Sequence, residues 1–191
     1  MSLNMPFHDH DHDEELMTQF FSYAALPLYK YALKLLGNPT YAEDAVQATF
    51  MQLLQYFDNI RTFSNERFLG YARKALLHQC AAIAKQQDKF PATEDLGKNE
   101  PDPAEPIVDF VERRATREEI RLCIEKLSPR YRFILYLKYF ENRSCDEVGA
   151  IMGLKESNVR TLLTRARAQL KLIYMRDILH DNSECSTTCT E

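Results

Sequence analysis

The sequence of 191 residues lacks tryptophan, has only five glycines, and contains no uncharged apolar run of the roughly 18 residues that a membrane-spanning helix requires. Residues 1–15 are polar and acidic, without the basic patch and apolar segment of a secretion signal. Hydrophobic residues make up 45% and charged residues 27% of the chain, as in ordinary globular proteins. We therefore expect a protein that is neither inserted into a membrane nor secreted.

The sequence also lacks the patterns of catalytic sites: a Gly-rich phosphate loop, a nucleophile elbow and paired carboxylates. The five cysteines are an odd number, and three of them lie in apolar helical patterns, so we predict a reduced, cytoplasmic protein. We expect no enzymatic activity and no cofactor. The terminal tails hold weak metal-ligand candidates, but isolated His or Cys residues lack supporting groups, and we interpret both tails as disordered. These candidates are His8, His10, His12, Cys185 and Cys189.

Period-two alternation is absent over any stretch long enough for a strand, whereas apolar residues recur with helical spacing, so the predicted fold class is all-α. Four of the eight prolines fall within 90–106, an acidic stretch without apolar periodicity. We predict two small helical domains joined by a flexible acidic linker. The expected parts are a polar His/Asp-rich tail (1–15), a helical bundle (16–89), the linker (90–106), a helix-turn-helix domain (107–176) and a C-terminal tail (177–191).

Three amphipathic helices are predicted in the first domain, over 26–36, 41–57 and 64–89. Thr40 and Glu43 form a capping-box pattern before the second helix. Asp44 and Gln47 lie three residues apart, so they share a polar edge of that helix. Its expected buried face consists of Ala42, Ala45, Val46, Phe50, Leu53, Leu54 and Phe57.

A helix-turn-helix is predicted near the end of the chain, after helices over 107–127 and 129–140 and an N-cap at Ser128. Ser144 and Glu147 form a capping box, and Gly153 suits the left-handed turn between the helices. Residues 155–176 hold six basic residues against Glu156 alone, a charge that suits contact with phosphates. A charged helical hairpin with a solvated face is the structural alternative. The residues expected to face a DNA groove and its phosphates are Ser157, Asn158, Arg160, Thr161, Thr164, Arg165 and Arg167.

Residues 127–140, 144–154 and 159–170 together resemble region 4 of the bacterial sigma-70 family, most closely its extracytoplasmic-function (ECF) group. Residues 28–38 followed by 42–50 resemble region 2 of the same group. The resemblance implies a transcription initiation factor that binds core RNA polymerase and directs it to promoter DNA. Such factors are commonly held inactive by an anti-sigma factor.

The resemblance also assigns roles to single residues. Asp44 and Gln47 match positions that contact the polymerase clamp helices, and His78 and Lys85 fall in the stretch that reads and melts the minus-ten element. This stretch lacks the family's arginine cluster, so we expect weak contact with the minus-ten DNA backbone. Further departures from the family pattern are Ala48, Ala82, Lys155 and Leu162.

Three hypotheses follow from these patterns. The leading one is an ECF sigma factor with region 2 on the polymerase and the minus-ten element and region 4 on the minus-thirty-five element. The second is a sigma mimic, which occupies an anti-sigma factor or polymerase without opening promoters, and the thin basic cluster over 78–89 prompts it. The third is a conventional helix-turn-helix regulator, against which the region 2 pattern argues.

Overall fold

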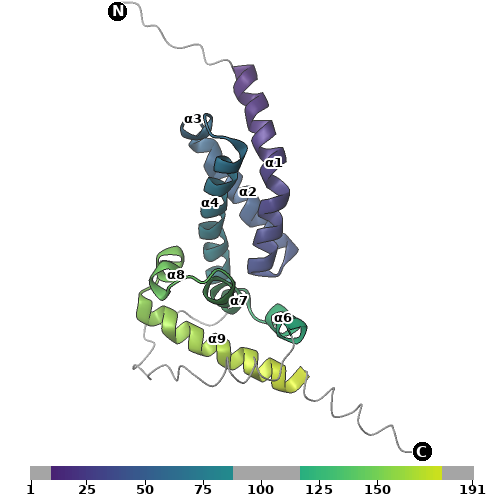
Figure 1. Cartoon of the computed structure of the whole chain (residues 1–191), viewed down its shortest axis with the longest axis vertical. Helices are drawn as coiled ribbons and strands as arrows, with labels where there is room; N and C mark the ends of the chain where they lie inside the picture. Colours follow the sequence, from purple (N-terminus) through teal and green to yellow (C-terminus); the bar gives the residue numbers. More distant parts are fainter. Residues whose placement is uncertain (1–9, 88–116, 178–191) are drawn as a thin grey trace, which may run out of the picture. The chain divides into compact units, whose positions relative to one another are not determined.

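A computed structural model describes residues 10–87 and 117–177 (Figure 1). All regular structure in these ranges is helical, which confirms the all-α prediction. The predicted linker over 90–106, His8, Cys185 and Cys189 lie outside the described residues, as do the side chains of His10 and His12. No described helix is both long enough and apolar enough to cross a membrane.

The chain divides into two compact units. The described part of the first unit contains three long helices whose contacts make a bundle: the rings of Phe20 and Phe68 stack at 4.3 Å, and Gln79 donates a hydrogen bond of 3.0 Å to Gln52. Cys80 is buried in this unit, and burial raises the pKa of its thiol to about 12. The helices are α1 (His10–Leu36), α2 (Pro39–Gln55), the short α3 (Phe57–Ile60) and α4 (Asn65–Gln86).

Helix α1 is much longer than predicted, because it continues through Pro27 toward the N-terminus. Proline removes one backbone hydrogen bond and usually breaks a helix. Here the buried side chains of Phe20, Ala24 and Leu28 keep helical spacing on both sides of Pro27, so packing against the bundle stabilises the continuous helix. The helix includes residues 10–15, which we expected to belong to a tail.

Helix α2 begins earlier than predicted, because Asn38 is the N-cap: its side chain accepts a hydrogen bond of 3.2 Å from the Tyr41 backbone, and Pro39 occupies the first turn. The prediction of a Thr40–Glu43 capping box is therefore wrong. The helix also ends before Phe57, which belongs to α3. Its buried residues are Ala42, Ala45, Thr49 and Leu53.

Among residues 117–177 the second unit contains five helical segments, and α9 contacts α6, α7 and α8 (Figure 1). This unit also includes residues 35–37 and the last turns of α4 from Ala81, a division different from the predicted boundary at residue 89. Cys123 is buried and Cys145 half-buried, both as free thiols. The segments are α6 (Arg117–Glu125), α7 (Pro129–Leu135), the π-helix η1 (Tyr136–Phe140), α8 (Cys145–Met152) and α9 (Glu156–Asp177).

The path from α6 to α8 depends on two local features. Arg132 of α7 donates hydrogen bonds to the carbonyls of Ile124 (3.1 Å) and Glu125, so its buried guanidinium satisfies the end of α6. Ser128 is the N-cap of α7 by position, but its side chain makes no capping bond. At the other end, η1 leads into Asn142, whose φ of 55° is left-handed and suits an asparagine.

Candidate functional site

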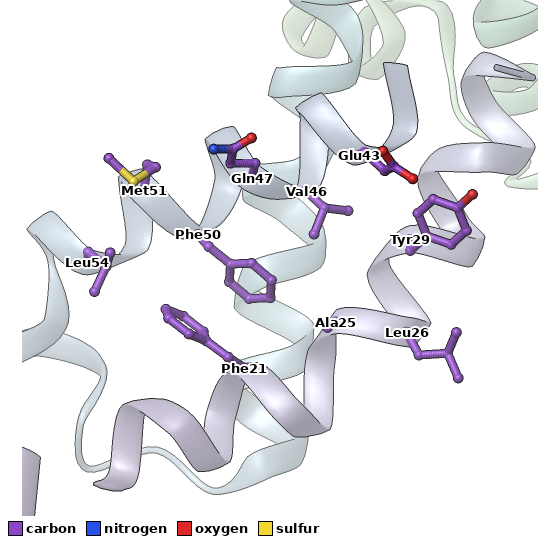
Figure 2. A pocket seen from close by; sticks show the side chains of 10 residues that line it. All are labelled: Phe21, Ala25, Leu26, Tyr29, Glu43, Val46, Gln47, Phe50, Met51 and Leu54. Carbon is purple, nitrogen blue, oxygen red and sulfur yellow. The ribbon is translucent and has the colours of Figure 1, made fainter. Parts of the chain in front are cut away.

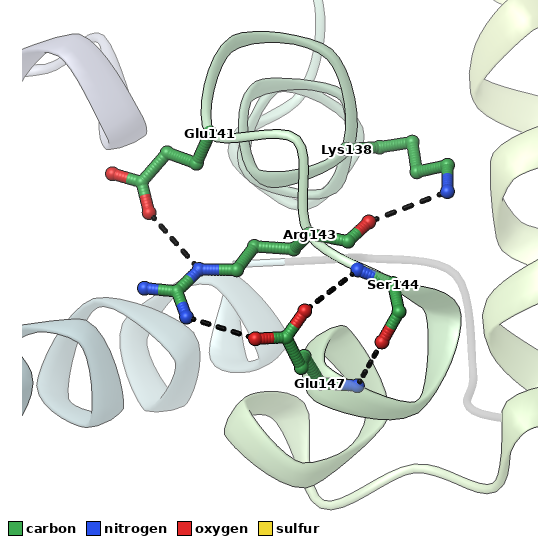
Figure 3. A network of polar contacts seen from close by, with 5 residues as sticks. All are labelled: Lys138, Glu141, Arg143, Ser144 and Glu147. Carbon is green, nitrogen blue, oxygen red and sulfur yellow. Dashed lines mark hydrogen bonds and ion pairs between the residues drawn. The ribbon is translucent and has the colours of Figure 1, made fainter.

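The first helix of the helix-turn-helix, α8, begins at a capping box that also pairs with a neighbouring arginine (Figure 3). The Glu147 carboxylate accepts a hydrogen bond of 2.8 Å from the Ser144 backbone N–H, and the Ser144 hydroxyl accepts one of 3.2 Å from the Glu147 N–H. Arg143 pairs with Glu147 at 3.1 Å and with Glu141 at 3.5 Å. The hydrogen bonds from Ser144 and Arg143 hold the pKa of Glu147 below its usual value. The predicted capping box is confirmed, and it fixes the start of α8.

Two glycines shape the turn between α8 and α9. Gly153 has φ 59° and ψ 44°, the left-handed conformation that the sequence predicted. A Cβ on Gly149 would lie 2.7 Å from the Leu154 carbonyl oxygen, closer than real contacts allow, and the same turn holds a hydrogen bond of 2.9 Å from Leu154 N–H to Gly149 O. Gly149 therefore makes room for the turn backbone rather than only for α9.

Helix α9 buries one face and exposes the other, much as predicted. Val159, Leu163 and Ala166 are buried, together with Leu162, which stands where the family commonly has an arginine and is a core residue here. The exposed or half-buried face consists of Ser157, Asn158, Arg160, Thr161, Thr164, Arg165 and Arg167. None of the seven residues predicted to contact DNA is therefore buried in the helix packing.

Several of these side chains already have partners on the protein. Arg160 donates through Nε to Glu156 Oε1 at 3.0 Å and through Nη2 to the same oxygen. The Thr164 hydroxyl bonds to the Arg160 carbonyl at 3.2 Å, and a bonded hydroxyl can still accept from a base. Arg167 donates to the Tyr139 hydroxyl at 2.7 Å, with its guanidinium 5.8 Å from that ring. Tyr139 therefore holds Arg167, a contact that sequence reasoning missed.

A second charged surface follows α4. His78 and Lys85, both predicted to contact DNA, are exposed, and Ala82 between them is exposed as well. The helical spacing places Arg67 and Lys74 on the same side, nearer the start of the helix, and both are exposed. We call Arg67, Lys74, His78 and Lys85 the α4 stripe. Sequence analysis considered only the residues from His78 onward and so missed half of the stripe.

Aromatic side chains lie at the N-terminal end of the α4 stripe. The guanidinium of Arg67 lies 4.0 Å from the centre of the Phe63 ring, and Tyr71 meets that ring edge-on at 6.0 Å. Tyr71 is 44% exposed. Cations next to exposed aromatic rings can hold the backbone and stack the bases of single-stranded nucleic acid.

An apolar groove lies between α1 and α2 and is lined by residues of both helices (Figure 2). The rings of Phe21 and Phe50 meet across it at 4.4 Å, and the groove has a volume of about 680 Å³. The predicted buried face of α2 is therefore wrong in part, because Val46, Phe50 and Leu54 line an open groove instead of the core. The remaining lining residues are Ala25, Leu26, Tyr29, Glu43, Gln47 and Met51.

The predicted polymerase-contacting pair lies on α2 beside this groove. Gln47 and Asp44 are both exposed, and Gln47 is part of the groove lining. Two large apolar side chains of the groove lining are exposed: Leu26 is 58% and Met51 59% exposed. An apolar surface with a polar rim is typical of protein-protein contacts.

Comparison with protein families gives two matches in order along the chain. Residues 21–89 match the model "Sigma-70 region 2", and residues 117–170 match the model "Sigma-70, region 4". The first match covers the groove and the α4 stripe, and the second covers the helix-turn-helix. The chain belongs to the sigma-70 family, in its extracytoplasmic-function group.

Individual relatives agree with this assignment. The chain is 25% identical over 171 residues to the RNA polymerase sigma factor YlaC of Bacillus subtilis, covering 84% of this chain and 91% of the relative. It is 25% identical to ECF RNA polymerase sigma factor SigM of the same species, covering 79% and 90%. It is 26% identical to ECF RNA polymerase sigma factor SigE of Mycolicibacterium smegmatis, covering 75% of this chain but only 56% of SigE.

Family membership decides between the broad function classes. Sigma factors are transcription initiation factors and not enzymes, so the family agrees with the predicted function and with the prediction of no catalysis. Their partners are core RNA polymerase and promoter DNA. The surfaces of region 2 and region 4 described above are the candidates for these contacts.

Proposed function

We propose that this ECF sigma factor binds core RNA polymerase through the α2 edge of region 2 and reads promoter DNA with α4 and α9. The observation that carries the proposal is the pair of family matches, with region 2 before region 4 along the chain. Each match falls on helices that expose polar or charged side chains suited to its partner. We assign region 2 to 16–89, extended at its start by the residues of α1 from His10, the linker to 90–106, and region 4 to 107–176, extended by Asp177 at the end of α9.

In region 2, Asp44 and Gln47 would contact the polymerase, with the groove beside them receiving apolar side chains of the partner. Support comes from their exposure and from the exposed apolar side chains of Leu26 and Met51 in the groove lining. A core of buried apolar contacts with charged or polar groups at its edge gives affinity and orientation together.

In region 4, α9 would enter the major groove at the minus-thirty-five element. Arg160 would contact a base edge, and Arg165 and Arg167 would contact phosphates, with polar contacts along the same face from Ser157, Asn158, Thr161 and Thr164. Support comes from the degree of burial of these residues: Ser157, Arg160 and Arg165 are exposed, and the other four are half-buried. Arg167 would have to exchange or share its bond to Tyr139 to reach a phosphate.

The α4 stripe, including His78 and Lys85, would follow the backbone of the minus-ten element. Its cations are widely spaced along the helix, so each makes a separate phosphate contact and the total is small. We therefore propose that the holoenzyme opens A·T-rich or supercoiled promoters most readily.

Regulation and location follow from the same assignment. We propose that an anti-sigma factor holds the protein inactive, because surfaces that bind polymerase are exposed in the free chain and an inhibitor must cover one of them. The polymerase and its promoters are in the cytoplasm, so we propose that the protein acts there.

Run-off transcription tests this function against its alternatives. Core polymerase with the protein should produce discrete transcripts from fragmented genomic DNA, and core polymerase alone should not. A sigma mimic would bind polymerase and give no transcripts, and an independent helix-turn-helix regulator would bind DNA without polymerase. The mimic is not favoured, because it has little need for the basic helix over 155–176.

A further inference from the structure

Glu156 is an acidic side chain in the first turn of α9, on the face assigned to DNA. It precedes Arg160 by four residues and Thr164 by eight, so the three lie along one line of the helix. Recognition helices contact base edges with their N-terminal residues. A carboxylate placed among DNA phosphates repels them, so its presence on this face requires a compensating role.

The contact between Glu156 and Arg160 suggests that role. One carboxylate oxygen, Oε1, accepts from both Nε, at 3.0 Å, and Nη2 of Arg160. The two side chains remain in solvent, 40% and 59% exposed. An arginine carries five N–H donors in a rigid plane, and a single acceptor oxygen cannot use all of them. Two bonds to one oxygen fix the direction of that plane in the free protein.

We propose that Glu156 is a positioning residue that orients Arg160 for a guanine contact and opposes its use on phosphates. This inference rests on the proposed role of α9 in reading DNA. Arginine reads guanine through two parallel bonds to O6 and N7, which require the guanidinium to lie in the plane of the base. A guanidinium that is already oriented loses less rotamer freedom on binding.

The negative charge of Glu156 adds discrimination by a second route. Phosphate contacts supply affinity for every sequence and carry no base information. Because Glu156 offsets the charge of Arg160, it weakens non-specific attraction more than it weakens the matched base contact. A repulsive element of this kind raises specificity without raising affinity.

A purely structural role for Glu156 predicts a different result. Acidic residues in a first turn and pairs four residues apart both stabilise helices. Loss of such a role lowers the melting temperature and weakens binding to all sequences equally. Loss of positioning changes the preference at one base position and strengthens binding to unrelated DNA.

The test uses the full chain assembled with core polymerase and a pool of duplexes randomised in the upstream promoter block. Bound duplexes are sequenced for wild type, E156Q, R160A and a control, E118Q. Glu118 is also in a first turn and pairs with an arginine, Arg121, at 3.8 Å, but it belongs to α6. E118Q therefore makes the same change of charge outside the helix-turn-helix.

For E156Q we expect a loss of about threefold to tenfold in preference at the single position that R160A also affects, part of what one bidentate contact provides. Binding of E156Q to an unrelated duplex should rise, with a salt dependence steeper by up to about 0.9 in the log–log slope. E118Q should match wild type. Wild-type preference at every position in E156Q, or a uniform loss of binding, would overturn the inference. If wild type itself enriched no sequence, the DNA-reading role of α9 would fall, and the inference with it.

Discussion

The two sigma regions expose different chemistry on helices of equal length. Helix α4 of region 2 and helix α9 of region 4 each contain 22 residues. On α4 the cations alternate with small exposed residues such as Gly70 and Ala82, and Arg67 rests on an aromatic ring. On α9 the cations alternate with hydroxyl and amide side chains, and Arg160 and Arg167 are hydrogen-bonded to Glu156 and Tyr139.

This difference separates two kinds of DNA contact. A helix with cations and few other polar groups can neutralise phosphates or flank stacked bases, but it offers few hydrogen bonds to base edges. A helix with serine, asparagine, threonine and oriented arginine side chains can read those edges. We therefore assign sequence reading in duplex DNA chiefly to α9 and backbone contact chiefly to α4.

The largest expected effect comes from crowding the turn that orients α9. Gly149→Ala places a Cβ 2.7 Å from a backbone oxygen, which cannot move aside as a flexible side chain can. We expect a loss of about 1–3 kcal/mol in the stability of region 4, typical of overpacking. Thermal unfolding followed by circular dichroism measures this loss.

Gly70→Ala is the matched control on α4, because nothing lies within 4 Å of its added Cβ. Alanine is the better helix former, so this variant should gain about 0.5–1 kcal/mol. Equal melting behaviour of the two variants would contradict the contrast between a tight turn in region 4 and an open surface on α4.

Replacing both Asp44 and Gln47 by alanine should weaken assembly with core polymerase by about 5- to 30-fold, because two polar contacts beside the apolar groove are lost together. Both are exposed, so the bundle should stay folded. Co-elution with core polymerase and a binding titration measure the effect. Gln55→Ala on the same helix is the control, because Gln55 is exposed and lies outside the groove lining. Unchanged assembly of the double variant would remove the assignment of this edge.

Two arginines of α9 should respond differently to substitution. Arg160→Ala should relax the preference at one base position by about 1–3 kcal/mol, whereas Arg165→Ala should lower affinity for all sequences and reduce the salt slope by about 0.9. Binding of the full chain with polymerase to a matched and a mismatched duplex, each over a range of salt, separates them. If both variants lost affinity uniformly, α9 would be a phosphate-binding helix like α4.

The smallest effect is expected on α4. Lys74→Ala and Lys85→Ala should each reduce the salt slope by no more than about 0.9, without changing base preference. Titrations of the holoenzyme on a promoter duplex at several salt concentrations provide the comparison. A change of base preference in either variant would show that α4 reads sequence, and the contrast with α9 would then be lost.

Local signals in the sequence predicted the helix-turn-helix well. The interactions of Ser144, Glu147 and Gly153 are with residues only a few positions away, so their roles do not depend on distant packing. The apolar stripe of α2 was also visible, but Val46 and Phe50 line a groove because no helix among the described residues covers them. Periodicity identifies an apolar face and cannot tell whether a partner is in the same chain.

Other features depended on tertiary structure and escaped the sequence analysis. The first helix was predicted to begin at residue 26, but it continues through Pro27 toward the N-terminus, because burial of Phe20 and Ala24 outweighs one missing hydrogen bond. The bond between Arg167 and Tyr139 joins residues 28 positions apart, which no spacing rule predicts. The α4 stripe, in contrast, could have been found by extending helical spacing back from His78 to Lys74 and Arg67.

Permanganate footprinting of the holoenzyme on supercoiled and linear copies of one promoter tests the central claim most directly, because it detects unpaired thymines. The account predicts that α9 holds the polymerase at the promoter on both templates and that the sparse α4 stripe opens the minus-ten element mainly where supercoiling assists. Thymines should therefore react strongly on the supercoiled template and weakly on the linear one. Bound polymerase with no reactive thymines on either template would contradict the account and indicate a protein that occupies polymerase without initiating transcription.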